Sequence, residues 1–206
     1  LGSDLRVAEL KAVAIDLALS DAPVLITGET GTGKELVARA LHRLGPRRDK
    51  EFVALNCATL APDRVEEQLF GTAETLLGSF RKADGGTLFL DEVAACPIPV
   101  QIKLLRAMET GVIQPVGTDA EIQTDVRIVA ATNEDLAPLV DAGLFRADFL
   151  FRLNAFELRL PRLIDRGDDI VMLYEHFVSQ FCETYEISPT ELTSEDAAAL
   201  LAHGWP

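Results

Sequence analysis

The sequence predicts an α/β fold in which a parallel sheet is covered by helices on both faces. Short apolar runs that suit buried strands alternate along the chain with segments of helical apolar spacing, and this alternation is typical of parallel sheets. A glycine-rich turn connects the first apolar run to a helical segment. After Leu160 charged residues and further helical patterns replace the apolar runs, so we expect a small helical region to follow the sheet.

Local sequence patterns predict the individual helices and strands, from the first helix onward. Helical apolar spacing predicts a first helix at residues 5–19, and the apolar run 23–27 predicts the first strand. A helical stretch over 35–42 follows the glycine-rich turn. Pro99 and Gly111 delimit a helix over 99–110, because proline suits a helix start and glycine the position after its end. The remaining expected strands are 52–55, 87–90, 126–131 and 155–160, and the remaining expected helices are 168–184 and 194–203.

The change of character after Leu160 indicates two domains. We expect an α/β core over residues 1–163 and a partial helical lid over residues 164–206. The lid is expected to be truncated, because no helix end or tail is evident at Trp205-Pro206. With 206 residues, 48% of them hydrophobic, the chain can bury a substantial core.

Composition limits the partners and the compartment. A formal net charge of −14 repels the backbone of nucleic acids, so any DNA contact is expected from a domain outside this chain. The cysteines, Cys57, Cys96 and Cys182, are scattered and indicate reduced thiols in a cytosol rather than disulfides or a metal site. No apolar run is long enough to cross a bilayer and no signal peptide opens the chain, so we expect a cytoplasmic protein without membrane contact.

The glycine-rich turn has the pattern of a phosphate-binding P-loop. Glycines let successive backbone N–H groups point into one hollow, and the start of the next helix adds partial positive charge. A terminal lysine brings a full charge to the outer phosphates. Glu35 then stands where a Ser or Thr hydroxyl usually binds Mg²⁺, so the metal must rely more on other groups, although Glu35 could take part. The loop residues are Gly28, Glu29, Thr30, Gly31, Thr32, Gly33 and Lys34.

A second motif lies where another apolar strand ends. The strand at 87–90 is followed by Asp91 and Glu92. In P-loop ATPases an acid at this place holds Mg²⁺, and a following glutamate can orient or deprotonate the attacking water. Since Gly28, Asp91 and Asn133 all follow strands, they predict a single site for a magnesium-bound nucleoside triphosphate at one edge of the sheet. The alternative is two ordinary, unrelated turns.

With these motifs, the chain resembles the AAA+ domain of bacterial enhancer-binding transcription activators of the NtrC type, which work with sigma-54 RNA polymerase. The family also carries glutamate after the P-loop lysine. The resemblance implies a three-layer P-loop AAA+ core, ATP and Mg²⁺ as cofactors, ATP hydrolysis and regulation of transcription within two-component systems. It also implies self-assembly from a resting dimer into a hexamer or heptamer ring. The matching segments are 24–35, 54–57, 69–71, 83–92, 126–133, 145–148, 152–154 and 160–161.

The resemblance implies roles for residues of the two motifs. Lys34 would contact the β- and γ-phosphates, Asp91 would serve Mg²⁺, and Glu92 would polarise water. Asn56 corresponds to the family's switch asparagine, which restrains that glutamate. The alternative for Asn56 is that it simply caps a turn.

It also implies roles for residues farther along the chain. Thr132 and Asn133 fall where the family has its sensor I. Arg146 and Arg152 fall where it has arginine fingers, which reach the ATP of the neighbouring subunit and make the ring necessary. The alternative for these two arginines is a pair of surface ion pairs. The sensor II arginine and a DNA-binding domain are expected beyond Pro206.

One segment departs from the family. The GAFTGA loop that contacts sigma-54 is missing after Leu69-Phe70-Gly71, and the segment 72–82 is shorter than in relatives. Branches without this loop, such as TyrR-like regulators, act with housekeeping polymerase or as repressors. Two alternatives to an ATP-hydrolysing regulator therefore stay open: a nucleotide-dependent oligomerisation switch that barely hydrolyses ATP, and an AAA+ chaperone of the MoxR or chelatase type. RNA polymerase holoenzyme is a possible partner under the regulator hypotheses.

Overall fold

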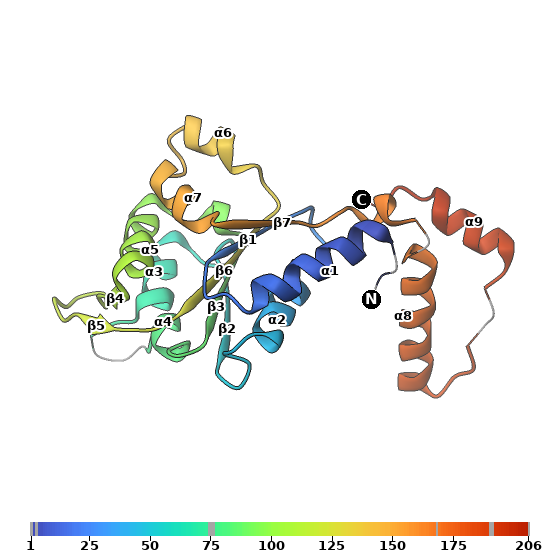
Figure 1. The fold of residues 1–206 in the computed structure, drawn as a ribbon, viewed down its shortest axis with the longest axis horizontal. Helices are drawn as coiled ribbons and strands as arrows, with labels where there is room; N and C mark the ends of the chain where they lie inside the picture. The colour runs from blue at the N-terminus through green and yellow to red at the C-terminus, as the bar shows by residue number, and fades with distance from the viewer. Residues whose placement is uncertain (1, 3, 74–76, 168, 190–191, 206) are drawn as a thin grey trace. The chain divides into compact units, whose positions relative to one another are not determined.

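The computed structural model describes residues 2, 4–73, 77–167, 169–189 and 192–205. The main element is a five-stranded sheet in which every neighbouring pair is parallel, with the strand order β2-β3-β6-β1-β7 (Figure 1). This confirms the predicted parallel α/β fold. The strands are β1 (Val24–Thr27), β2 (Phe52–Asn56), β3 (Thr87–Asp91), β6 (Arg127–Thr132) and β7 (Phe156–Arg159).

Both faces of the sheet are covered, as the buried strands require. Side chains alternate between the faces along each strand. Helix α2 (Lys34–Leu44) lies on one face, and α3 (Pro62–Phe70), α4 (Ser79–Lys82) and α5 (Ile98–Thr110) lie toward the other (Figure 1). Leu25, Leu88, Leu90, Ile128 and Ala130 belong to the core on the side of α3 and α5. The alternate residues Val24, Ile26, Phe89, Val129 and Ala131 are also buried.

The remaining elements of this region are short. A 3₁₀ turn, η1 (Val93–Ala95), follows β3 directly, and β4 (Val112–Ile113) pairs with β5 (Ile122–Gln123) in an antiparallel ribbon. Helices α6 (Leu136–Asp141) and α7 (Ala147–Leu153) precede β7. The sequence patterns predict no helix or strand at η1, β4, β5, α6 or α7, nor at α3 or α4.

The chain divides into two compact units. Residues 14–159 form one unit, and residues 1–13 form the other together with residues 160–206. The sequence placed residues 1–13 in the core and ended the core at residue 163. The observed grouping differs because the backbone N–H of Asp4 donates to Asp169 Oδ1 at 3.1 Å, which ties the start of the chain to the second unit. Core and lid as functional domains stay a prediction.

The second unit is helical, as expected. It contains the first part of α1 (Leu5–Ala18), the 3₁₀ turn η2 (Leu163–Arg166), α8 (Asp169–Tyr185) and α9 (Ser194–Ala202). A capping box begins α9: the Thr193 side chain accepts from the backbone N–H of Asp196, and the Asp196 carboxylate accepts from that of Thr193. Residue 168, the expected start of α8, lies outside the described residues. None of the described helices is long and apolar enough to cross a bilayer.

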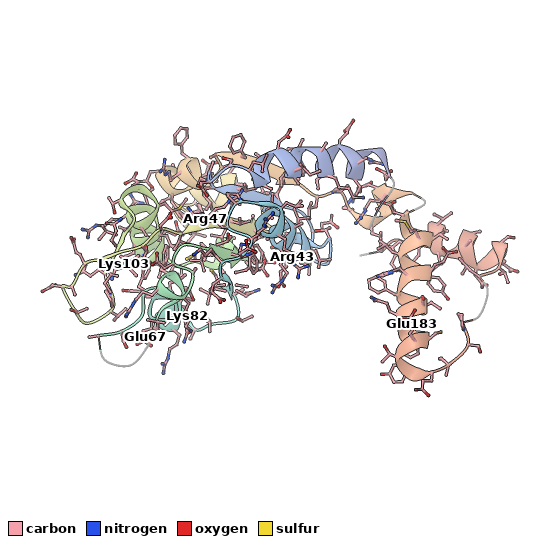
Figure 2. The ribbon with its side chains drawn as sticks, turned by 60° about the horizontal axis from the view of Figure 1, so that its bottom comes forward. Arg43, Arg47, Glu67, Lys82, Lys103 and Glu183 are labelled. Carbon is pink, nitrogen blue, oxygen red and sulfur yellow. The ribbon has the colours of Figure 1, made fainter. Side chains whose placement is uncertain are left out.

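Buried polar side chains join the amino ends of the strands. Arg47 (Figure 2) forms ion pairs of 2.8 Å with both Asp21 and Asp125, and its Nη1 donates to the carbonyl of Gly86. These partners precede β1, β6 and β3, so one guanidinium holds three strand starts together. Arg127, only 3% exposed, donates to the carbonyls of residues 17 and 18 at the end of α1.

A histidine is buried at the same edge. His42 Nδ1 lies 3.0 Å from the hydroxyl oxygen of Thr87, the first residue of β3, and the imidazole ring packs against Phe52. Burial lowers the pKa of His42 below its ordinary value of 6.5, because the apolar surroundings disfavour the charged ring. The imidazole is therefore a structural, neutral group at this edge.

Candidate functional site

The glycine-rich loop lies at the carboxyl edge of the sheet, between β1 and α2. Its first residue, Gly28, donates its N–H to the carbonyl of Thr132 at the end of β6. Gly31 and Gly33 have φ values of 84° and 93°, in the left-handed region where side chains are strained, so glycine is required at these turns. Gly33 is the N-cap of α2. The loop therefore presents backbone N–H groups and the positive end of a helix, the features that bind phosphate.

Lys34 extends from the first turn of α2 back over this loop. Its side chain is 7% exposed, and its Nζ donates to the carbonyls of Gly28 at 3.0 Å and Glu29 at 3.3 Å. The same Nζ lies 3.8 Å from Glu92 Oε1. The predicted P-loop and the predicted acidic strand end are thus on the same side of the sheet and in contact.

Asp91 ends β3 beside the end of β2. Asn56 Nδ2 donates to Asp91 Oδ2 at 3.0 Å, and the two residues are partners in the strand register. The amide oxygen of Asn56 accepts from the backbone N–H groups of Ala58 and Thr59. In this structure Asn56 therefore contacts Asp91, not the glutamate that the family's switch asparagine restrains, and it also makes the turn contacts of the simpler alternative.

Glu92 is held in an unusual backbone conformation. Its φ of 50° and ψ of 51° are left-handed, which costs a non-glycine residue about 1 kcal/mol. Its Oε2 accepts from the backbone N–H of Asn133 at 3.4 Å, and its Oε1 faces Lys34. The carboxylate thus lies between the lysine of the P-loop and the end of β6.

Asn133 joins the end of β6 to the glycine-rich loop. Its Nδ2 donates to the Thr30 hydroxyl at 3.0 Å, while its backbone N–H contacts Glu92. The neighbouring Thr132 is fully buried, and its hydroxyl accepts from the N–H of Glu134. Asn133 is therefore the predicted sensor residue that reaches the loop, whereas Thr132 stabilises the turn beneath it.

The donor groups at this edge suit Mg²⁺ bound to phosphates. Mg²⁺ in nucleotide sites takes one or two carboxylates and completes its shell with phosphate oxygens and water. Asp91 supplies a carboxylate beside the loop, and no group of three or more His, Cys, Asp or Glu in the described residues forms a dedicated protein cage. Glu35 instead forms an ion pair of 2.7 Å with Arg39 along α2, where both side chains are about half exposed.

Arg146 and Arg152 lie at the two ends of α7. The Arg146 guanidinium pairs with Asp148 at 2.7 Å, and this carboxylate raises the pKa of Arg146 while its own pKa is lowered. Arg152 Nη2 donates to the carbonyl of Met108 at 3.1 Å. Within the described part, neither guanidinium has a hydrogen bond or ion pair with Lys34, Asp91 or Glu92 of its own chain. The chain's own fold therefore does not bring them into the site.

Two further polar residues near this edge were not selected from the sequence. Glu157 of β7 accepts from the Thr27 hydroxyl at 2.7 Å, directly before the P-loop, and only the alternation of polar and apolar residues along the strand hints at it. Gln101 of α5 is fully buried. A polar residue in the apolar stripe with Val100 and Leu104 is the signal that could have identified it.

The cysteines of the core lie near this edge as free thiols. Cys57 follows Asn56 directly, Cys96 follows η1, and both are buried. The pKa of the Cys96 thiol is raised, first by its hydrogen bond with Cys57 and then by burial. The Cys96 thiol is therefore expected to stay protonated at neutral pH.

Comparison with protein families finds one that spans most of the chain. Residues 1–159 match the family described as "Sigma-54 interaction domain". The C4-dicarboxylate transport transcriptional regulatory protein DctD of Pseudomonas aeruginosa is 44% identical over 214 residues, which cover 100% of this chain and 46% of DctD. The HTH-type transcriptional regulatory protein TyrR of Salmonella typhimurium is 44% identical over 191 residues, which cover 92% of this chain and 37% of TyrR. The chain thus spans less than half the length of these relatives.

Solved structures agree with this match. NtrX from Brucella abortus in complex with ADP is 37% identical, with a TM-score of 0.97 over 100% of this chain and 46% of NtrX. The same protein in complex with ATP has a TM-score of 0.94. The P-loop NTPase domain of an Escherichia coli sigma-54 transport activator has a TM-score of 0.57 at 21% identity over 79% of this chain and 99% of that domain, a likeness of fold alone.

Proposed function

The chain belongs to the family of sigma-54 interaction domains, and from this premise we propose that it binds ATP with Mg²⁺ and hydrolyses it. The observation that carries the proposal is the 3.8 Å approach of Lys34 Nζ to Glu92 Oε1. This contact joins a phosphate-binding loop to an acidic strand end at one edge of the sheet. NtrX, which is similar over the whole chain, forms complexes with ATP and ADP.

We propose the following roles within one subunit. Lys34 and the loop N–H groups bind the β- and γ-phosphates. Asp91 would hold Mg²⁺, which neutralises phosphate charge when bound. Glu92 orients the attacking water and accepts its proton. Asn133, which contacts both Glu92 and Thr30, keeps that carboxylate aligned with the loop.

The site is proposed to be completed by a second subunit. Arg146 is partly exposed, pairs with Asp148 and makes no contact with the described site of its own chain. A guanidinium that exchanges this carboxylate for the γ-phosphate of a neighbour would stabilise the charge of the transition state. Arg152, also exposed on α7, is proposed as a second finger. The resulting assembly is a ring, and turnover depends on its formation.

The experiment that tests this proposal measures phosphate release at increasing protein concentration. Turnover per subunit should rise steeply, because isolated subunits lack the arginine of a neighbour. Arg146→Ala should leave ATP affinity within about twofold and lower turnover by roughly 10³-fold. Arg48→Ala is the matched control, since Arg48 is also exposed and ion-paired to a nearby aspartate. Unchanged turnover in Arg146→Ala would remove the finger assignment.

A second candidate function, an ATP-dependent regulator that does not contact sigma-54, is favoured by the segment after α3. Residues 74–76 of that segment lie outside the described residues, but its two ends meet closely. A Cβ placed on Gly78 would lie 2.3 Å from the backbone N of Gly71, so the segment between these two glycines starts and ends at one point, and it is only six residues long. A TyrR protein is among the relatives of equal identity. The chain would then assemble with ATP but fail to bind purified sigma-54 holoenzyme, which a pull-down measures.

Further proposals concern the compartment, the resting state and the DNA contact of the protein. We propose a cytoplasmic protein that rests as a dimer and reaches DNA through a domain outside the 206 residues, since the formal charge of −14 disfavours contact with phosphate backbones. The nucleotide-dependent switch without hydrolysis predicts ATP-driven assembly with negligible phosphate release. The same concentration series distinguishes it from the ATPase.

A further inference from the structure

Gln101 is an uncharged polar side chain buried completely in the core of the larger unit. It belongs to α5, where Val100, Leu104 and Ala107 are also buried. Its relative exposure is 0%. A buried amide costs free energy unless its hydrogen-bonding groups are satisfied, so its partners show what it does.

The side-chain amide of Gln101 contacts three separate backbone groups. Its Nε2 donates to the carbonyl of Cys96 at 2.7 Å and to that of Leu144 at 3.2 Å. Its Oε1 accepts from the backbone N–H of Arg146 at 2.9 Å. The two amide hydrogens are thus used on carbonyls, and the oxygen is used on the residue whose side chain is the proposed finger.

Arg146 depends on this contact because of its place at the end of a helix. It is the N-cap of α7, and no side-chain capping hydrogen bond is present there. The first helical N–H groups lack intrahelical partners, so the direction in which α7 starts must be fixed from outside. Phe145, directly before Arg146, is buried against Phe149, and this packing restrains the chain on one side. Gln101 restrains it on the other.

The other two partners anchor Gln101 itself. Cys96 closes the 3₁₀ turn that begins at Glu92: the N–H of Ala95 donates to the carbonyl of Glu92, and that of Cys96 to the carbonyl of Val93. Gln101 therefore connects the backbone that carries Glu92 to the backbone that carries Arg146. This connection runs through three hydrogen bonds of a single side chain.

We propose that Gln101 is a positioning residue that fixes the backbone of Arg146 so that its guanidinium can reach the site of the adjacent subunit. This inference rests on the proposed function, in which Arg146 acts in trans. It assigns Gln101 an effect on the neighbour's turnover and not on nucleotide binding or turnover in its own site.

The experiment mixes two kinds of inactive subunit in equal amounts. An acceptor subunit carries Arg146→Ala and keeps Glu92, while a donor subunit carries Glu92→Gln and keeps Arg146. Neither hydrolyses ATP alone, but a site formed by an acceptor next to a donor is complete, so the mixture should regain turnover. Gln101→Met, which keeps the length of the side chain without its hydrogen bonds, is then added to one partner at a time.

Gln101→Met in the donor should lower the regained phosphate release by about tenfold or more, the effect expected when a charged group is displaced from the transition state. The same substitution in the acceptor should change it by less than about twofold. A general loss of folding would act in both partners, so the asymmetry separates positioning from structure. Gln123→Met in the donor is the control, because Gln123 is exposed and its side chain makes one hydrogen bond, to Thr110.

Three outcomes would overturn the inference. Equal losses from donor and acceptor would mean that Gln101 is only structural, and no loss from the donor would mean that Arg146 does not need it. If the mixture without Gln101→Met regains no turnover, Arg146 does not act in the neighbouring subunit. The proposed function is then wrong, and the role inferred for Gln101 is lost with it. Fluorescent ATP binding and thermal unfolding check that each Gln101→Met subunit is folded. Gln101→Leu, which is uncharged and smaller, replaces it if it is not.

Discussion

The carboxyl and amino edges of the five-stranded sheet both hold charged or polar side chains, but those side chains contact different partners. At the carboxyl edge Lys34 contacts loop carbonyls and Glu92. Asp91 and Glu92 each accept a hydrogen bond from an asparagine. At the amino edge Arg47 pairs with aspartates that precede two strands, and Arg127 donates to backbone carbonyls at the end of α1. Both sets include well-buried cations.

The difference lies in which contacts a ligand could replace. Phosphate oxygens and Mg²⁺ can take over the contacts of Lys34 and Asp91, because these contacts line one loop and one strand end. The carbonyls that Arg127 binds end a helix, and within the described contacts only that of residue 17 has another donor, the N–H of Ser20. We therefore expect substitutions at the carboxyl edge to change binding or turnover, and substitutions at the amino edge to change the free energy of unfolding.

The largest effect is expected from Glu92→Gln at the carboxyl edge. Without a carboxylate to accept the proton of water, turnover should fall by roughly 10³-fold, within the range for a lost general base. ATP binding should be kept, since the amide cannot repel phosphate. Phosphate release and fluorescent ATP titration measure the two quantities. Residual turnover above about a tenth of the original would contradict the role of Glu92.

Lys34→Ala should abolish measurable nucleotide binding. Two charge-assisted hydrogen bonds to phosphate are worth about 3 kcal/mol together, which is a loss of at least about 100-fold in affinity. The midpoint of thermal unfolding should change little, because the chain loses only the contacts of a site residue. Calorimetric titration with ATP checks the first expectation. Tight binding by this variant would mean that phosphate does not lie at the loop.

Arg127→Met tests the opposite edge. It leaves the carbonyl of residue 18 at the end of α1 without a donor and that of residue 17 with only the N–H of Ser20, which should lower the free energy of unfolding by about 2 kcal/mol. Burial lowers the pKa of this guanidinium, and the charge of Asp21 offsets part of that effect. Because burying the charge itself costs free energy, an uncharged methionine recovers part of the lost stability. Denaturant titration measures the change. A variant of unaltered stability with weakened ATP binding would reverse the comparison.

The smallest effect is expected from pH at the same edge. The pKa of His42 is lowered in the folded chain, so folding favours the neutral ring. The stabilisation is complete above the unfolded pKa of 6.5 and is lost progressively as pH falls below it. Relative to His42→Gln, the original chain should lose stability between roughly pH 8 and pH 5.5, by at most about 1.4 kcal/mol for the one pH unit below 6.5. Equal pH dependence of unfolding in the original chain and in His42→Gln would contradict a lowered pKa of His42.

The sheet could be predicted from the sequence because its strands are nearly uniform in character. Runs such as 88–90 are apolar throughout, since both faces of a central parallel strand are covered. Helix α3 was missed although Pro62 begins it and Gly71 follows it, because four of its nine residues are charged. The hairpin β4–β5 has two residues in each strand, too few for any alternation to be visible.

The site was predictable as far as local sequence reaches. The loop at 28–34 and the acids at 91–92 are contiguous motifs, and their meeting follows from the parallel sheet. The partner of Asn56 was not predictable from spacing, because the strand register decides whether it reaches Asp91 or Glu92. The position of Gln101 depends on how α5 packs against α7, and that packing brings together residues 45 positions apart.

Because the backbone of Glu92 is left-handed, the residue that would be most stable at this position differs from the one proposed for activity. Glycine would adopt the same φ without strain, and asparagine with less, so either would favour the folded chain by a few tenths of a kcal/mol or more. Both would also remove the carboxylate on which turnover is proposed to depend. A more stable chain and a chain with faster turnover therefore require different side chains at this position.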